Sequence, residues 1–376
     1  MPEPFKTFFN VALIERMGAH LAARDPRFDR AGFVAAASDG LDALELKARS
    51  GQIADALEAY LPQDFAAACG LMLAALHPNT DAPISQMDMD DAGIRGWAVM
   101  PMAEVVARRG APDLDRSMAT LAEMTKRFSA EFAVRPFLAA EPARAMACMH
   151  RFAQDPNAHV RRLASEGSRP RLPWGMRLTA FVADPAPLIP LLERLRDDPS
   201  DYVRRSVANS LNDIAKDHPE LVARLAADWL TDAPPERAQL IRHACRSLVK
   251  AGHPATLAAL GFVPAQVETE VAITAQLVHY GGALHFAVTL RSGASAPQKL
   301  VVDYAIHFRK ANGGTAPKVF KLRTLTLPPA DTVRLARQHA IRPITTRRYY
   351  DGAHRLEILV NGTPAAEAPF TLQGAG

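Results

Sequence analysis

The chain has 376 residues, of which 48% are hydrophobic and only 7% aromatic, a balance typical of Ala- and Leu-rich helical packing. This length suggests two or three domains with a sizeable buried core. No stretch approaches the roughly 20 uninterrupted apolar residues that a membrane helix needs, and the N-terminus lacks the apolar core of a signal peptide. We therefore expect a soluble, cytoplasmic protein without membrane contact. The three cysteines lie far apart, which excludes a disulfide framework and a zinc site.

Charge is distributed unevenly along the chain, although the formal net charge is only +4. Residues 1–130 hold 13 basic and 18 acidic side chains, residues 131–266 hold 18 and 15, and residues 267–376 hold 13 and 7. A polyanionic partner would bind the middle and C-terminal parts, because attraction to phosphates follows clustered Lys and Arg. An ordinary solvated surface gives similar totals, so charge alone leaves nucleic-acid binding open.

Residues 1–264 are predicted to form a helical domain. Apolar residues recur three and four positions apart in this part, as expected when one face of each helix is buried. Short breaks that contain Pro, Gly or Asp separate the segments. The clearest predicted helices cover residues 12–25, 44–61, 64–77, 102–110 and 117–134.

An internal repeat appears in the middle of this domain. The stretch "DPNAHVRRLASEG" begins at Asp155, and "DPSDYVRRSVANSL" begins at Asp198, 43 residues later, with a looser echo around Ile241. A period of roughly 40 to 47 residues is typical of HEAT-like helix pairs, which stack into a curved solenoid. The Asp-Pro pair suits a helix start, since Asp can cap the helix and Pro is tolerated in the first turn. We therefore predict an α-solenoid.

From residue 265 to residue 376 the pattern changes to short strands. Stretches such as "ALHFAVTLR" and "LVVDYAIHFRK" alternate apolar and polar residues, and turn signals such as "NGG", "DG" and "NG" separate them. Seven or so strands in this length indicate an immunoglobulin-like β-sandwich. The sandwich would lack an inter-sheet disulfide, because it contains no cysteine.

The repeat also predicts a polar strip that recurs from one helix pair to the next. On a helix over residues 203–216, Arg205, Asn209 and Asn212 lie opposite an apolar stripe. A shift of 43 residues places Arg162, Glu166 and Arg169 at the equivalent positions. Stacked second helices commonly line the concave surface of a solenoid, so these side chains predict an extended basic groove.

Several of these side chains also have a structural interpretation. Arg162 and Glu166 are four residues apart, as are Glu131 and Arg135, and either pair would be a surface ion pair worth about 0.3 to 0.5 kcal/mol. Asp213 lies at the edge of the strip and would hydrogen-bond to a neighbouring loop. The residues alone leave both interpretations open.

Trp174 stands directly after a proline in an arginine-rich stretch, where it would either anchor a loop onto the core or contact a sugar or base. Trp97 and Trp229 are predicted to be packing residues. The chain has no HExxH motif, Walker loop, GxSxG elbow or dinucleotide-binding fingerprint. We therefore expect neither a metal nor a nucleotide cofactor.

The chain resembles the AlkC-type DNA glycosylases of the HEAT-like-repeat superfamily, bacterial enzymes that remove alkylated bases. The resemblance rests on four stretches within the helical part, and some members of the group carry a C-terminal immunoglobulin-like domain. These stretches are "ELKARSGQIADAL" (45–57), "FSAEFAVRPFL" (128–138), "HVRRLASEGSRPRLPWGMRL" (159–178) and "YVRRSVANSLNDIAKDHP" (202–219).

The resemblance implies excision of cationic N-alkylated bases such as 3-methyladenine and 3-methylcytosine from double-stranded DNA by a monomer. It implies that the duplex bends across the groove, without conventional flipping of the base into a deep pocket. By motif position Glu131, Glu166 and Asp213 would be the catalytic acids. The DNA-binding residues would be Arg161, Arg162, Arg169, Trp174, Arg205, Asn209 and Asn212. The alternative function is a non-catalytic scaffold that binds nucleic acid or protein through the same groove.

Overall fold

The computed structural model describes residues 5–83, 88–344 and 347–375. The chain forms two compact units, Met1–Asp217 and His218–Gly376. The change from helix to strand falls later, between Ala259 and Val267. A boundary at residue 264 thus separates helices from strands, whereas the last helices belong to the second compact unit.

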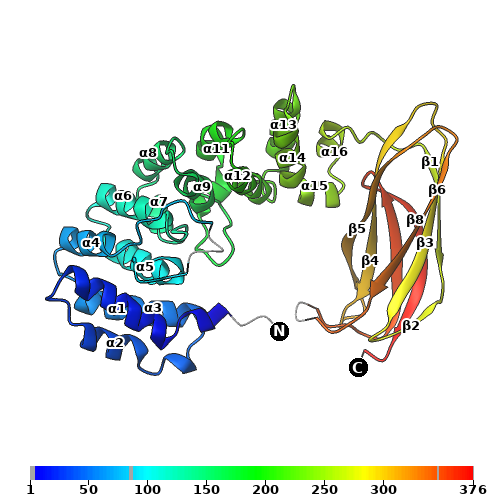
Figure 1. Cartoon of the computed structure of the whole chain (residues 1–376). Helices are drawn as coiled ribbons and strands as arrows, with labels where there is room; N and C mark the ends of the chain where they lie inside the picture. Colours follow the sequence, from blue (N-terminus) through cyan, green and yellow to red (C-terminus); the bar gives the residue numbers. More distant parts are fainter. Residues whose placement is uncertain (1–4, 84–87, 345–346, 376) are drawn as a thin grey trace. The chain divides into compact units, whose positions relative to one another are not determined.

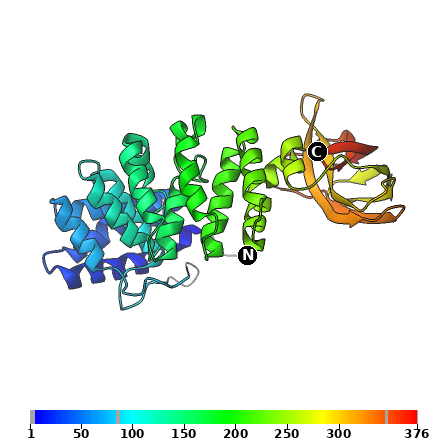
Figure 2. The same ribbon diagram turned by 90° about the horizontal axis from the view of Figure 1, so that it is seen from above.

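The first unit is a stack of helices that follow one another along an arc (Figure 1). Successive helices stand side by side when this unit is seen from above (Figure 2). No helix in the described ranges is long and apolar enough to cross a membrane. The elements of the unit are η1 (Phe5–Phe8), α1 (Val11–Arg24), α2 (Arg30–Ser38), η2 (Leu41–Ala43), α3 (Leu46–Tyr60), α4 (Phe65–Ala74), η4 (Gly96–Ala98), α5 (Val99–Arg109), α6 (Leu114–Thr125), α7 (Arg135–Ala140), α8 (Pro142–Phe152), α9 (Ala158–Gly167), α10 (Thr179–Ala183), η5 (Ala186–Leu188), α11 (Ile189–Leu195) and α12 (Asp201–Ile214).

The repeated Asp-Pro pair forms a turn before each second helix and does not itself cap the helix. Asp155 Oδ1 accepts the Asn157 N–H at 2.8 Å, and Asp198 Oδ1 accepts the Ser200 N–H at 2.9 Å. The N-caps of α9 and α12 are therefore Asn157 and Ser200, and the Asn157 side chain accepts the His159 N–H. The predicted capping role of Asp was wrong by two residues, because its short side chain closes a local turn instead.

The first arginine of each Val-Arg-Arg motif holds this turn in place. Arg161 Nη1 donates to the carbonyls of Asp155 and Pro156, and Arg204 Nη1 donates in the same way to those of Asp198 and Pro199. Arg161 also forms a two-point ion pair with Asp198, at 2.6 and 3.0 Å. This pair links α9 to the turn before α12, so successive repeats are joined by a charge-assisted bond as well as by apolar packing.

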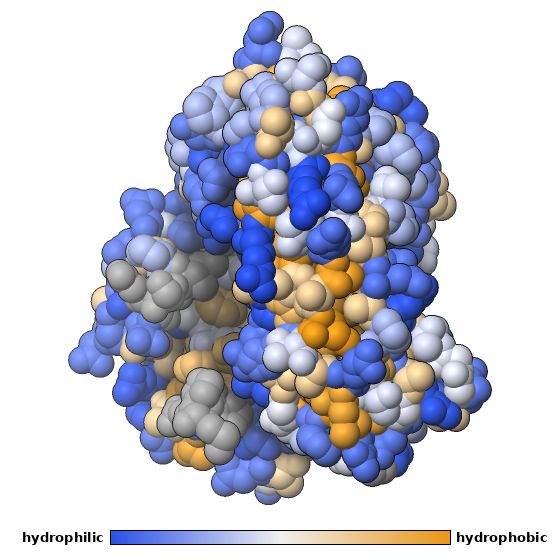
Figure 3. Space-filling view, turned by 90° about the vertical axis from the view of Figure 1, so that its right-hand side faces the viewer, coloured by the Kyte–Doolittle hydropathy of each residue, from blue (hydrophilic) through white to orange (hydrophobic). Residues whose placement is uncertain are grey.

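In the residues that the structure describes, the second unit combines four helices with two sheets that pack over a common apolar core. The sheet orders are β1-β3-β6 and β2-β8-β7-β4-β5, and neighbouring strands are antiparallel except β2 and β8. The face nearest the viewer in Figure 3 is mostly hydrophilic, around a strip of apolar side chains. The elements are α13 (Pro219–Leu230), α14 (Pro235–Ala244), α15 (Arg246–Lys250), α16 (Pro254–Ala259), β1 (Val267–Ile273), β2 (Leu277–His279), β3 (Ala283–Ser292), β4 (Gln298–Arg309), β5 (Thr315–Leu327), β6 (Thr332–Ala340), β7 (Gly352–Val360) and β8 (Thr363–Gln373).

The mostly α fold with a terminal β-sandwich is confirmed, but one strand has no clear signal in the sequence. Strand β8 contains Pro364, Pro369 and several alanines, which are depleted in strands. It forms because Phe370 and Leu372 are buried in the sandwich core, while β7 supplies a full antiparallel partner. Tertiary burial therefore outweighs weak local propensity in this strand.

Candidate active site

A cavity of about 700 Å³ opens in the first unit, beside the repeated polar strip. The turn that follows α6, helix α9 and the loop after α9 form its walls, together with the start of α3 and the 3-10 turn before α5. Its lining includes Lys47, Trp97, Phe128, Glu131, Arg162, Glu166, Arg169 and Trp174. In the described part of the chain, no group of three or more His, Cys, Asp or Glu side chains could hold a metal ion.

Glu131 lies in a turn and not on a helix. The predicted helix over residues 117–134 ends at Thr125, and residues 126–134 form turns before α7 begins. The Glu131 carboxylate accepts hydrogen bonds from Ser129 Oγ and Arg162 Nη1, both through Oε2. Within the described residues Oε1 has no hydrogen bond or ion pair, and it is available to a ligand in the cavity.

Glu166 is buried at the end of α9, with 6% of its surface exposed. Its Oε1 accepts from Arg169 Nη1 at 2.7 Å and lies 3.4 Å from Arg162 Nη2, while Oε2 accepts from Ser206 Oγ at 2.7 Å. Burial alone would raise the pKa of Glu166, but the charges of Arg162 and Arg169 outweigh it and lower that pKa. The predicted surface ion pair is thus a buried network that holds a charged carboxylate at the cavity.

Arg162 joins the two acids. Its Nη1 donates to Ser129 Oγ at 2.6 Å as well as to Glu131, and its guanidinium lies 5.1 Å from the centre of the Tyr202 ring. Burial disfavours the cation, yet the carboxylates of Glu131 and Glu166 raise the pKa of Arg162. One partly buried cation therefore fixes the positions of both carboxylates.

Arg169 lines the cavity beside Glu166, and Asp213 lies behind Arg169. Helix α9 ends at Gly167, so Arg169 lies in the following loop and not on the predicted helical strip. Its Nε donates to Asp213 Oδ2 at 2.9 Å, and Lys216 Nζ contacts the other oxygen at 3.1 Å. Asp213 is 3% exposed and does not line the cavity. It is buried behind Arg169 and not at an edge.

The predicted ion pair between Glu131 and Arg135 does not form. Arg135 is completely buried, and its guanidinium donates to the backbone carbonyls of Gly167, Arg169 and Met176. The i,i+4 spacing is misleading here because Glu131 precedes the helix, so the two side chains do not share a helical face.

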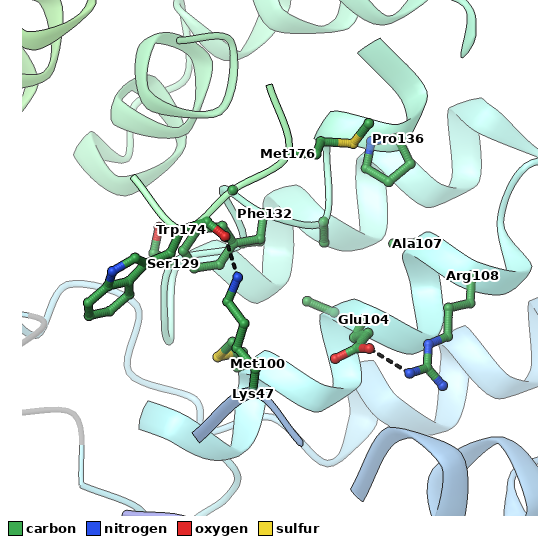
Figure 4. A pocket seen from close by; sticks show the side chains of 14 residues that line it. Lys47, Met100, Glu104, Ala107, Arg108, Ser129, Phe132, Pro136, Trp174 and Met176 are labelled. Carbon is green, nitrogen blue, oxygen red and sulfur yellow. Dashed lines mark hydrogen bonds and ion pairs between the residues drawn. The ribbon is translucent and has the colours of Figure 1, made fainter. Parts of the chain in front are cut away.

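Trp174 projects into solvent, with 63% of its surface exposed. Its φ of +64° is left-handed, a conformation that bulky residues rarely adopt, and its carbonyl accepts from Lys47 Nζ across the mouth of a smaller cavity of about 360 Å³ (Figure 4). The alternative in which this ring anchors a loop onto the core is therefore wrong. The Trp174 ring is therefore available to a ligand at the rim of the larger cavity.

Aromatic residues that the sequence did not single out line the same cavity. Trp97 is only half-buried and stacks on Phe8, with ring centres 5.1 Å apart and planes 7° apart, and Phe128 also packs against the Trp97 ring. Trp97 was predicted to be a packing residue and does pack against Phe8, Phe9 and Phe128, but it also forms a wall of the cavity. Trp229, predicted in the same way, is 1% exposed and is confirmed.

The remaining predicted DNA-binding residues lie outside the cavity. The Arg161 guanidinium is occupied by Asp198 and two carbonyls, an arrangement that favours a structural role. The Arg205 side chain is 67% exposed and pairs with Asp201 at 2.7 Å. On the same helix Asn209 is half-buried and Asn212 is buried. The contacts of these four residues with DNA stay predictions.

Comparison with known proteins identifies the family. Residues 267–374 match the family described as "Uncharacterised protein YhaZ, C-terminal Ig-like domain", and residues 188–218 match the HEAT repeat. The uncharacterized protein YhaZ of Bacillus subtilis (strain 168) is 33% identical over 360 residues, 95% of this chain and 96% of the relative. The structure of Pseudomonas fluorescens alkylpurine DNA glycosylase AlkC, bound to DNA containing an abasic site analog, is 39% identical at a TM-score of 0.89, and the match covers 99% of this chain and 100% of that one. The chain therefore belongs to the AlkC-type family of the HEAT-like-repeat superfamily, with its C-terminal immunoglobulin-like domain.

Proposed function

We propose that this protein is a DNA glycosylase that hydrolyses the N-glycosidic bond of cationic N-alkylated bases such as 3-methyladenine and 3-methylcytosine. One observation carries the proposal: Glu131 and Glu166 lie at a single cavity and are held there by the same partly buried arginine, Arg162. The likeness to a DNA-bound alkylpurine glycosylase over nearly the whole chain supports it.

The chemistry requires fixed negative charge and an oriented water. An alkylated base that already carries positive charge leaves without a general acid, and an oxocarbenium-like sugar remains. Glu166, which contacts Arg162, Arg169 and Ser206, acts as the fixed charge that stabilises this sugar. Glu131, whose Oε1 is available, orients the attacking water. The reaction breaks the sugar–base bond, whose electron pair leaves with the base, and forms a bond between water oxygen and the sugar carbon, while the water passes a proton to the Glu131 carboxylate.

Asp213 acts in this scheme through another residue. It contacts Arg169, which contacts Glu166, so its charge keeps Arg169 in the position that holds the catalytic carboxylate. Asp213 is therefore a positioning acid, whereas Glu131 and Glu166 face the lesion. We assign these different roles because Glu131 and Glu166 line the cavity and Asp213 does not.

Double-stranded DNA with an alkylated base is the proposed partner. Arg162 and Trp174 contact the lesion nucleotide, and Arg205, Asn209 and Asn212 contact the flanking backbone, where they position the duplex. The duplex bends across this basic surface, so that the lesion reaches the acids without entering a deep pocket. The exposed Trp174 ring suits stacking on an unstacked base or sugar.

The immunoglobulin-like domain is proposed to clamp the same DNA. Exposed cations line β5 and β6, each of which is an edge strand of its own sheet, and none of them has an ion-pair partner in the described residues. Unpaired surface cations are free to neutralise phosphates. These residues are Lys318, Lys321, Arg323, Arg334 and Arg337.

Incubation of the purified protein with a methylated duplex tests the function, with chromatography of released bases and alkaline cleavage at abasic sites. Release of 3-methyladenine or 3-methylcytosine that disappears in Glu131→Gln supports the proposal. Glu104→Gln is the matched control, because Glu104 is also paired with an arginine but lines only the neighbouring cavity. Salt-sensitive binding without release would instead favour the non-catalytic scaffold.

A further inference from the structure

Arg135 is the most unusual cation in the first unit. It begins helix α7 and is 0% exposed, yet in the described residues it has no carboxylate within ion-pair distance. Burying a cation without a counter-ion is costly unless its donors are hydrogen-bonded. Burial, followed by the charge of Arg169, lowers the pKa of Arg135 to about 10, so the side chain is still cationic at neutral pH.

Every donor contact of Arg135 goes to the backbone of one loop. Nη1 donates to Gly167 and Arg169 carbonyls at 2.8 Å each, and Nε donates to the Met176 carbonyl at 2.7 Å, with Nη2 on the same oxygen. Gly167 and Arg169 stand where the chain leaves α9, whereas Met176 stands near its return into α10. The guanidinium therefore ties the two ends of residues 168–178 together.

This loop, defined here as the active-site loop (residues 168–178), carries side chains of the proposed site at both of its ends. Arg169 contacts Glu166 and Asp213, and Trp174 reaches the cavity rim in a left-handed conformation. A Cβ added to Gly175 would lie 3.3 Å from Arg135 Nε, so the loop backbone packs directly on the guanidinium. Lys47 Nζ donates to the Trp174 carbonyl of the same loop (Figure 4).

We propose that Arg135 is a positioning residue: its buried guanidinium fixes the active-site loop and thereby the places of Arg169 and Trp174 at the cavity. The predicted effect on the excision rate rests on the proposed function. The predicted effect on the position of the loop does not depend on it. Only a planar fork with several donors can serve carbonyls at both ends of the loop, so lysine is not an equivalent substitute.

The test uses the full chain labelled with 5-fluorotryptophan, in which Trp174→Phe identifies the Trp174 fluorine resonance. We expect Arg135→Lys to shift or broaden this resonance and to leave that of the buried Trp229 unchanged. Arg49→Lys is the matched control, because Arg49 is 5% exposed and also donates to backbone carbonyls, at Phe9, Asp42 and Leu44. The control variant should lose a buried guanidinium without moving Trp174.

Measurement of the excision rate distinguishes a positioning role of Arg135 from a general loss of stability. Arg135→Lys should lower the single-turnover excision rate by about 10- to 100-fold, because small misplacements of reacting groups have effects of this size. Binding to a duplex with an abasic site analog should change by less than about threefold, since the phosphate contacts that dominate affinity remain. A folded Arg135→Lys protein with an unmoved Trp174 resonance overturns the inference.

Further outcomes keep the two proposals apart. If wild-type protein excises nothing, the proposed function fails, while the fluorine spectra of the free protein still decide the role of Arg135. If Arg135→Lys does not fold, Gly175→Ala decides, because its methyl group would lie 3.2 Å from Leu172 Cδ2 and 3.3 Å from Arg135 Nε, which tightens the contact between loop and guanidinium and leaves the cation intact. We expect the same displacement of the Trp174 resonance; an unchanged spectrum would contradict it.

Discussion

Glu166→Gln tests most directly whether the proposed site needs the negative charge of this side chain or only its shape. Glutamine keeps the length of the side chain and an oxygen that can accept from Arg169 or Ser206. It removes the negative charge that lies 2.7 Å from Arg169 and 3.4 Å from Arg162. Excision should therefore fall sharply while the cavity keeps its shape.

The expected magnitudes follow from burial. Loss of one preorganised electrostatic group lowers the catalytic rate by about 10²- to 10³-fold. Removing one partner of a buried ion pair costs about 3 to 5 kcal/mol of unfolding free energy. We expect the lower end, about 3 kcal/mol, because Glu131 still faces Arg162 and Asp213 still faces Arg169.

The effect on stability also has a predicted pH dependence. The folded-state pKa of Glu166 is lowered, so its ionised form stabilises the fold above its ordinary pKa. This contribution is lost as the pH falls through the lowered pKa. The difference in unfolding free energy between wild type and Glu166→Gln should therefore be constant at neutral pH and shrink below about pH 4.

Single-turnover excision from a methylated duplex measures the rate, and urea unfolding at several pH values measures the stability. Binding to a duplex with an abasic site analog should stay close to wild type, because Glu166 makes no proposed phosphate contact. Glu104→Gln again serves as control. The reasoning is refuted if Glu166→Gln excises at the wild-type rate, or if binding and excision fall together by the same factor.

Three further predictions concern other parts of the chain. Glu131→Gln should abolish excision with a smaller loss of stability than Glu166→Gln, measured in the same assays, because one Glu131 oxygen is unbound. Lys321→Gln combined with Arg334→Gln should lower the slope of log affinity against log salt by about two, measured in DNA-binding titrations. Burial lowers the pKa of His339 to about 4, so stability of the second unit should fall between about pH 6.5 and 4 in urea unfolding, and His339→Gln should flatten that fall.

Sequence periodicity was sufficient for most of the helices, the repeat and the sandwich, because each depends on local patterns of apolar residues, but it missed the end of the helix predicted over residues 117–134 and strand β8. The repeat placed Arg162 and Glu166 on one strip and the family resemblance added Glu131, and these three residues line the same cavity. Trp97 and Arg135 could not be found this way. Their roles depend on which backbone segments meet in space, and an arginine that binds carbonyls has no partner residue type to mark it in a sequence.

The repeated Val-Arg-Arg motif explains why a strongly basic stretch can serve both stability and function. Neighbouring residues on a helix point about 100° apart, so two adjacent arginines cannot face the same surroundings. The guanidinium of the first arginine, Arg161 or Arg204, donates hydrogen bonds to the carbonyls of its own Asp-Pro turn and is occupied there. The second, Arg162 or Arg205, is left to face acids or solvent. Counting arginines therefore overstates the charge available to DNA, and the register of the repeat decides which cations remain free to bind it.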